Sequence, residues 1–238
     1  MRLDQRLLEL KLCADLPTAQ GLIMGNQILV NDQPAVKPGL KVKESDQIRV
    51  RHQTKWVSRS AVKLDHFLEE NSISVTGRVC LDVGASTGGF TQVLLERGAS
   101  LIYALDVAYG IIDHKLRNHA GVRMIERTNI RNIDSGTFSP LPEFWVADVS
   151  FISVTEVFRA IHRVFPSYEA VVLFKPQFET SRDNLRKGVV VSQEVTEEEL
   201  RKFEEFIASI DVRILGKDKA SIRGARGNQE YLYYLRYP

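Results

Sequence analysis

The feature that most constrains this chain is a glycine-rich turn between an apolar run and a helical pattern. The run covers 81–83, the turn covers 84–89, and 90–95 have the spacing of a helix. Glycines let the backbone turn sharply and approach a ligand, and a helix N-terminus presents unpaired N–H groups. About 20 residues later a second predicted strand, 101–105, ends in Asp106. A carboxylate at that spacing can hold a ribose, so the sequence predicts a nucleoside-containing cofactor at the first crossover of a parallel sheet.

The order of residues in the turn separates classes of cofactor. A dinucleotide-binding turn has the pattern G-x-G-x-x-G, and Ser86 occupies the place of its second glycine. A P-loop needs Gly-Lys-Ser/Thr, which does not follow here. The turn instead resembles motif I of class I S-adenosylmethionine-dependent methyltransferases. That resemblance implies S-adenosyl-L-methionine as cofactor, with these contacts: Asp82, Gly84, Ala85, Ser86, Thr87, Gly88, Gly89 and Phe90 in and around the turn, Asp106 at the ribose, Asn129 beside the adenine, and Asp148 at a later strand end.

Repeated alternation of strand and helix patterns from residue 58 onward predicts the fold. Apolar runs at 79–83, 122–125, 144–148 and 170–175 predict strands. We expect an α/β fold with a doubly wound, mostly parallel Rossmann-like methyltransferase sheet and a small N-terminal α+β domain. The run at 231–235 follows the preceding strand without a helix between them, so an antiparallel edge strand is an alternative here. Thr196-Glu197-Glu198-Glu199 predicts a capping box that opens a helix.

The N-terminal part has its own basic pattern. Residues 1–57 hold nine lysines and arginines against six acidic residues, whereas 58–238 hold 23 against 24. Two short helices, with strands at 28–30 and 48–50, resemble the S-four-like RNA-binding domain. We predict this domain at 1–51, a linker at 52–57 and the methyltransferase domain at 58–238. Alternation with apolar residues predicts an exposed β-segment that carries Lys37, Lys41 and Lys43 on one face. The residues expected to bind RNA here are Arg2, Arg6, Lys11, Lys37, Lys41 and Lys43; the alternative is that they are only solvated.

Four ionisable residues stand where predicted elements begin or end. Lys63 lies on the helix before the first strand, Asp148 and Lys175 end two later strands, and Glu230 opens the last strand. The carboxyl ends of strands face the ligand crevice of a doubly wound sheet, so Asp148 and Lys175 are expected to converge. The order Lys, Asp, Lys, Glu resembles the catalytic tetrad of the RrmJ/FtsJ-like RNA ribose 2′-O-methyltransferases, which implies a catalytic role for all four.

The chemistry of ribose methylation explains the choice of a lysine. The attacking hydroxyl oxygen must lose its proton as it takes the methyl group. A partly buried lysine beside a second cation can act as the base or orient the oxygen lone pair. We predict this role for Lys175, with Asp148 and Glu230 holding it in place and Lys63 supplying the neighbouring charge.

Local sequences along nearly the whole chain resemble the TlyA (hemolysin A) family. They include Trp56-Val57-Ser58-Arg59, the turn at 82–90, 147–153, 174–179 and 224–230. The resemblance implies an S-adenosylmethionine-dependent rRNA (cytidine-2′-O)-methyltransferase, with ribosomal RNA or ribosomal subunits as partner. Further cations are expected to face RNA, namely Arg59, Arg182, Arg186 and Lys187; the alternative is that the loop cations are only solvated.

Two other functions stay open: a non-catalytic RNA-binding protein on a methyltransferase scaffold, and a membrane-lytic hemolysin. The longest apolar run, near 170–174, is much shorter than the ~18 residues of a membrane span. The N-terminus lacks the apolar segment of a secretory signal. Cys13 and Cys80 are far apart, so we predict buried free thiols. We therefore expect a cytoplasmic enzyme without a metal site, membrane contact or evident obligate protein partner.

Overall fold

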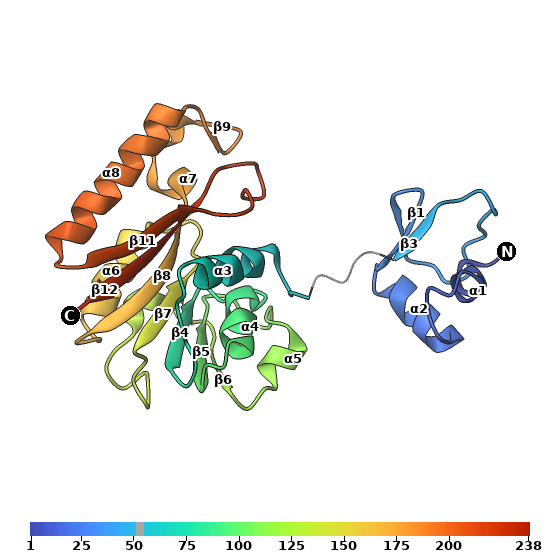
Figure 1. Ribbon diagram of the computed structural model, residues 1–238, viewed down its shortest axis with the longest axis horizontal. Coiled ribbons are helices and arrows are strands. Elements are labelled where there is room, and N and C mark those ends of the chain that lie inside the picture. Colours follow the sequence, from blue (N-terminus) through green and yellow to red (C-terminus); the bar gives the residue numbers. More distant parts are fainter. Residues whose placement is uncertain (51–54) are drawn as a thin grey trace. The chain divides into compact units, whose positions relative to one another are not determined.

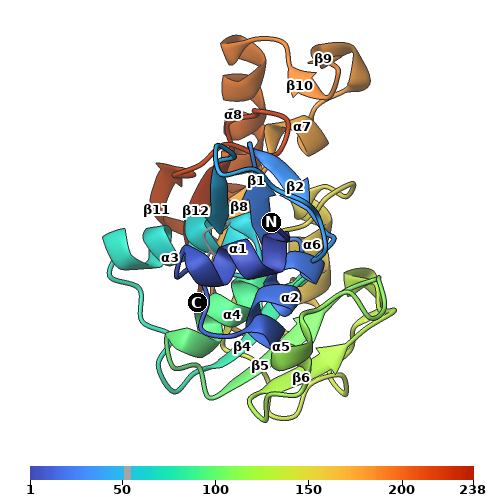
Figure 2. The ribbon, with the colours of Figure 1, turned by 90° about the vertical axis from the view of Figure 1, so that its right-hand side faces the viewer.

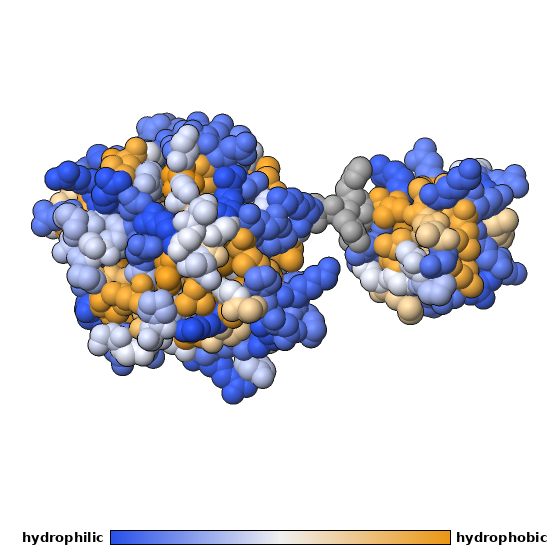
Figure 3. Space-filling model, turned by 60° about the horizontal axis from the view of Figure 1, so that its bottom comes forward, coloured by the Kyte–Doolittle hydropathy of each residue, from blue (hydrophilic) through white to orange (hydrophobic). Residues whose placement is uncertain are grey.

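The chain folds into two compact units, Met1–Lys55 and Trp56–Pro238 (Figure 1). The structure, a computed structural model, describes residues 1–50 and 55–238. The predicted linker at 52–57 therefore lies partly outside the described residues. Hydrophilic residues cover most of the visible surface of the larger unit (Figure 3). Among the described residues, no helix combines the length and the apolar character needed to cross a bilayer.

The smaller unit packs two helices against a three-stranded antiparallel sheet of order β2-β1-β3. Its core includes the buried Leu3, Leu7 and Ile23. Asp15 caps the second helix, because its side chain accepts a hydrogen bond from the Thr18 N–H at 2.8 Å. The elements are α1 (Leu3–Glu9), α2 (Leu16–Met24), β1 (Ile28–Val30), β2 (Gln33–Ala35) and β3 (Ile48–Val50). The helices and the strands at 28–30 and 48–50 agree with the sequence prediction.

The predicted lysine-bearing β-segment is wrong. The only extended structure between 36 and 47 is an isolated bridge that pairs Lys41 with Arg2. The extra strand lies earlier, at β2, and contains Pro34, which an edge strand tolerates. Lys37, Lys41 and Lys43 are all exposed, but they stand on a loop. Strand alternation therefore does not place them on one face.

A seven-stranded sheet of order β11-β12-β8-β7-β4-β5-β6 forms the centre of the larger unit. The five strands from β4 to β8 are parallel, and β12 is antiparallel to both of its neighbours. The last strand is thus interior, and β11 forms the edge. The strands are β4 (Val79–Val83), β5 (Leu101–Leu105), β6 (Val122–Ile125), β7 (Phe144–Ala147), β8 (Tyr168–Phe174), β11 (Arg213–Lys219) and β12 (Tyr231–Tyr237).

Helices cover both faces of this sheet, which confirms the doubly wound architecture. The core on one face contains buried residues of α6 and α8 with Trp145 and Tyr233, and the other contains residues of α3 and α4 with Val146 and Leu173. Cys80 is buried as predicted, whereas Cys13 is half-buried, and both thiols are free. The helices are α3 (Arg59–Glu70), α4 (Gly89–Glu96), α5 (His114–Arg117), α6 (Val154–His162), α7 (Pro176–Glu179) and α8 (Gln193–Ser209), with 3₁₀ turns at Ile130–Asn132 and Arg182–Asn184.

The start of α8 differs from the predicted capping box. The helix begins at Gln193, and Ser192 is its N-cap, because the Ser192 side chain accepts from the Val195 N–H. Thr196 and Glu199 lie inside the helix and are buried. Upstream of α8, a two-stranded hairpin of β9 (Leu185–Arg186) and β10 (Val189–Val190) stands apart from the main sheet (Figure 2).

Candidate active site

A hollow of about 390 Å³ opens at the carboxyl ends of β4, β5 and β7. Five of the predicted cofactor residues line it: Gly84, Ser86, Asp106, Asn129 and Asp148. Apolar side chains complete the lining, including Val107, Ile111 and Ile130. The hollow therefore combines polar groups at strand ends with an apolar wall, as expected of a nucleoside site.

The end of β4 reaches this hollow because Gly84 has no side chain. Gly84 has a φ of +83°, and a Cβ atom there would lie 2.9 Å from the Asp148 carbonyl oxygen. The glycine therefore lets two strand ends approach closely. Asp106 is held from both sides: the Ser86 N–H donates to its Oδ2 at 2.8 Å, and the Ala108 N–H donates to its Oδ1 at 2.8 Å.

Other residues of the predicted motif serve the fold and do not line the hollow. A Cβ on Gly88 would overlap Leu116, and one on Gly89 would overlap the Ser58 hydroxyl, so these glycines let helices pack. Ala85 and Phe90 are buried in core clusters. Thr87 is exposed, and its carbonyl accepts from the Asp113 N–H.

Asp82 lies fully buried beneath the turn. Its Oδ2 accepts a hydrogen bond from the Thr91 hydroxyl at 2.6 Å, whereas its Oδ1 has no hydrogen-bond partner. Burial raises the pKa of Asp82 to about 7, and the neighbouring Asp148 acts in the same direction. Asp82 is therefore a poorly solvated acid behind the cofactor turn.

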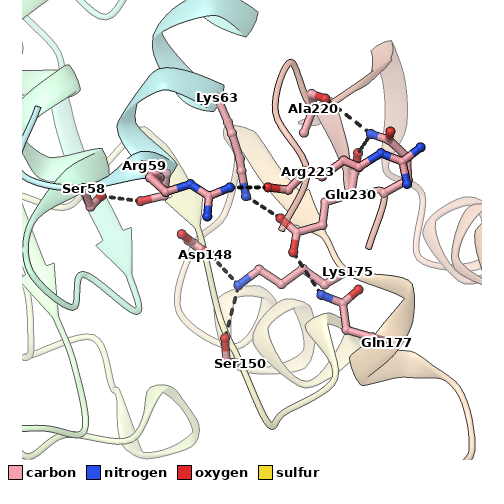
Figure 4. A network of polar contacts seen from close by, with 12 residues as sticks. Ser58, Arg59, Lys63, Asp148, Ser150, Lys175, Gln177, Ala220, Arg223 and Glu230 are labelled. Carbon is pink, nitrogen blue, oxygen red and sulfur yellow. Dashed lines mark hydrogen bonds and ion pairs between the residues drawn. The ribbon is translucent and has the colours of Figure 1, made fainter. Parts of the chain in front are cut away.

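The four tetrad residues all line a second, larger hollow of about 750 Å³, the tetrad hollow. The structure joins them as two ion pairs (Figure 4). Lys63 Nζ lies 2.5 Å from Glu230 Oε2, and Lys175 Nζ lies 2.5 Å from Asp148 Oδ1. Lys175 also donates to the Ser150 hydroxyl at 3.2 Å. Asp148 and Lys175 converge as expected, whereas Glu230, which was expected to hold Lys175, pairs with Lys63 and offsets its charge.

The two hollows share one wall. Asp148, Ser150 and Phe151 line both of them. A group that projects from the smaller hollow past this wall therefore enters the space around Lys175. Two adjoining hollows of this kind offer the geometry that a group transfer between two bound molecules requires.

Phe151 has an unusual conformation at this wall. It is 93% exposed, and its φ of 65° is rare for a bulky side chain. Its ring centroid lies 5.1 Å from that of Phe178. Strained, exposed residues of this kind gather at functional sites.

Several supporting residues were missed by sequence reasoning. Gln177 donates to Glu230 Oε1 at 2.9 Å, and a Cβ on Gly224 would overlap the same carboxylate. Glu179 accepts from the Ser153 hydroxyl at 2.6 Å and from the Val154 N–H at 2.9 Å, and burial raises its pKa. It thereby ties the segment after Asp148 to the helix after Lys175. The only sequence evidence for these residues is that Ser153, Gln177 and Glu179 lie within the family-like sequences 147–153 and 174–179.

The cations expected to face RNA fall into two groups. Arg2 and Arg6 have acidic partners, since Arg2 pairs with Asp4 at 2.6 Å and Arg6 with Glu9 at 2.6 Å. Arg2 holds the pKa of Asp4 down to about 2. The others are exposed, and no ion pair involves them among the described residues: Lys11, Lys37, Lys41, Lys43, Arg59, Arg182, Arg186 and Lys187.

Comparison with known proteins agrees with the division of the chain into two units. The FtsJ-like methyltransferase model matches residues 56–237, and the S4 domain model matches residues 1–48. Hemolysin A of Brachyspira hyodysenteriae is 37% identical over 238 residues, covering 99% of both chains. The 16S/23S rRNA (cytidine-2′-O)-methyltransferase TlyA of Mycobacterium tuberculosis is 36% identical over 243 residues, covering 99% of this chain and 89% of the relative. A solved structure of a candidate hemolysin from Streptococcus thermophilus is 32% identical with a TM-score of 0.76, covering 99% of this chain and 88% of that one. On sequence and fold alike, this chain belongs to the TlyA (hemolysin A) family of FtsJ-like methyltransferases.

Proposed function

We propose that this protein transfers a methyl group from S-adenosyl-L-methionine to the 2′-hydroxyl of a cytidine in ribosomal RNA. The observation that carries the proposal is the gathering of Lys63, Asp148, Lys175 and Glu230 in one hollow that shares a wall with the cofactor hollow. The nucleotide and RNA class come from the relatives' names. We also propose residues 1–51 as the RNA-binding domain and 58–238 as the catalytic domain. Because the substrate is ribosomal RNA, the proposal implies action in the cytoplasm.

The smaller hollow fits this cofactor. Asp106 presents carboxylate oxygens that can accept from ribose hydroxyls, while Ile111 and Ile130 offer apolar contact to a flat base. Gly84 lines the same hollow, where its backbone can face the methionine end of the cofactor. When bound, S-adenosylmethionine supplies a methyl group already activated by its positive sulfur.

The protein's own residues orient the acceptor oxygen and handle its proton. In the proposed mechanism, Lys175 Nζ lies beside the 2′-hydroxyl. It orients a lone pair of the hydroxyl oxygen toward the methyl carbon. The oxygen forms its new bond to the methyl carbon while the carbon–sulfur bond breaks, and the hydroxyl proton leaves to water. Asp148 and Ser150 fix the position of Lys175, and the Lys63–Glu230 ion pair lines the same larger hollow. In-line positioning contributes most of the acceleration.

Phe151 and the unpaired cations support an RNA substrate. An exposed aromatic ring can stack on an unpaired base, as single-stranded RNA recognition commonly uses. Arg59 and Arg182 line the same hollow and can bind phosphates.

The test combines methyl transfer with a single substitution. Ribosomal subunits lacking the modification are incubated with tritiated cofactor, and 2′-O-methyl positions are mapped. We expect a methylated cytidine with the wild type. Lys175→Ala should abolish transfer while the cofactor Kd changes by only a few-fold. Lys202→Ala, which removes another ion-paired lysine, is the matched control and should be active. Near wild-type turnover in Lys175→Ala would overturn the assignment, and no transfer by the wild type would favour the scaffold function.

A further inference from the structure

Cations without acidic partners gather around the tetrad hollow. Elsewhere in this unit many are neutralised, as Arg78 is by Glu169 and Arg97 by Asp65. Among the described residues, no ion pair involves the following cations, which line the hollow or stand on the adjoining hairpin: Arg59, Arg182, Arg186, Lys187, Arg223 and Arg226. Uncompensated positive charge of this kind attracts a polyanion.

Two of these cations belong to a hairpin that has little anchorage of its own. The strands β9 and β10 pair only with each other, and none of their four residues is buried. A separate hollow of about 310 Å³ is bordered by Val189, Val190, the start of α8 and Asn228. An isolated two-stranded hairpin is marginally stable in water. The position of this hairpin therefore depends on its contacts with neighbouring elements, which include α7, α8 and the loop before β12.

Asn228 supplies the hydrogen bonds that tie the hairpin strands and turn to the loop before β12. It is only 5% exposed. Its Nδ2 donates to the Gly188 carbonyl at 2.8 Å, and the Val190 N–H donates to its Oδ1 at 3.0 Å. The same residue's carbonyl accepts from the Gly224 N–H at 2.9 Å, and Gly224 abuts Glu230. Asn228 thus connects the hairpin to the loop that holds the tetrad carboxylate.

We infer that Asn228 is a positioning residue for RNA, which fixes the β9–β10 hairpin so that Arg186 and Lys187 bind phosphates beside the target ribose. The inference rests on the proposed function for the identity of the polyanion. Gly188 and Leu185 line the tetrad hollow, so the hairpin forms one side of its entrance. A phosphodiester strand that lies along this side receives charge from Arg182, which lines the same hollow. Asn228 also lines the tetrad hollow, but its side-chain amide is hydrogen-bonded to Gly188 and Val190, so it acts through the hairpin.

The experiment separates RNA affinity from chemistry in the full chain. Binding of a fluorescein-labelled 12-nucleotide single-stranded RNA is measured by anisotropy, and transfer is measured on ribosomal subunits. We expect Asn228→Ala to raise the RNA Kd and the KM about tenfold, with kcat and the cofactor Kd within twofold. The matched control is Asn71→Ala, which removes an asparagine that joins α3 to Asp218 on β11, and its RNA Kd should not change. A loss of kcat with unchanged RNA Kd would overturn the inference.

A double-mutant cycle tests whether Asn228 acts through the hairpin. Arg186→Ala with Lys187→Ala should raise the RNA Kd about tenfold and flatten the slope of log K against log salt by about 1.4, since each phosphate contact in single strands contributes roughly 0.7. Adding Asn228→Ala to this pair should change the Kd by less than twofold. A full further tenfold increase would overturn the inference, because the two effects would then be independent.

Two outcomes keep the inference distinct from the proposed function. Both cation sites are exposed, so their variants should fold even where Asn228→Ala does not, and an unchanged RNA Kd in the double cation variant overturns the inference by itself. A wild type that binds RNA with these responses, yet methylates none, supports the hairpin and refutes the enzyme. A wild type that binds neither this RNA nor ribosomal subunits refutes both.

Discussion

At the scale of single residues, Asp82 links protonation to stability. A fully buried acid whose pKa rises from 3.8 to about 7 holds its proton more tightly in the folded state than in the unfolded chain. Its contribution to the free energy of unfolding is therefore greatest below pH 4, falls as the pH rises from about 4 to 7, and stays constant above that.

Asp82→Asn should remove this pH dependence. The amide does not titrate, and its oxygen can still accept from Thr91. We expect the stability of the variant relative to the wild type to rise by a few kcal/mol between pH 4 and 8, at about 1.4 kcal/mol per pKa unit. Urea unfolding at several pH values, followed by the fluorescence of the buried Trp145, measures the difference. Parallel curves for the two proteins would contradict the assignment of the shift to Asp82.

At the scale of secondary structure elements, periodicity predicted the parallel strands, and the positions of Asp148 and Lys175 at strand ends predicted that these two converge. Lys63 and Glu230 entered the tetrad through the family resemblance. The parallel strands are continuous apolar runs, because both faces of the sheet are covered. The edge strand β11 was not predicted, since its exposed residues include Arg213, Lys217 and Lys219 and show no apolar pattern. The roles of Asn228 and Gln177 could not be predicted from the sequence either. Their partners lie 38 to 53 residues away, so only the tertiary structure brings them together.

The N-cap of α8 gives an element-scale prediction. Thr196 matched the capping pattern, but Ser192 precedes it and caps the helix. Ser192→Ala should lower the free energy of unfolding by about 1 kcal/mol, because one N-terminal N–H loses its acceptor. Glu205→Ala is the control on the same helix: it removes an exposed ion pair with Arg201 and should cost less than about 0.5 kcal/mol. Urea denaturation compares them, and equal costs would argue against Ser192 as the cap.

At the scale of the whole molecule, uncompensated cations stand on both units, whereas the cofactor hollow is lined only from Trp56–Pro238 among the described residues. Replacing Lys37, Lys41 and Lys43 by alanine should weaken RNA binding and lower its salt slope by roughly 2, while the cofactor Kd stays within twofold. The control replaces three cations that have carboxylate partners: Arg159, Arg201 and Lys202. Titrations at several salt concentrations distinguish the two sets, and equal losses would show that only net charge matters.

The two backbone hydrogen bonds to the Asp106 carboxylate also limit which cofactor analogues the protein can bind. Both oxygens are oriented before any ligand arrives, so the carboxylate cannot rotate to follow an altered sugar. Methyl donors whose sugar lacks either hydroxyl should then bind poorly, even when their base and sulfur are intact. In the proposed mode of binding, donors extended at the transferred group leave the Asp106 contact unchanged and direct the extension into the space around Lys175. Such reagents could label the modified nucleotide directly, with the sugar selecting the donor and the larger hollow setting the size of the tag.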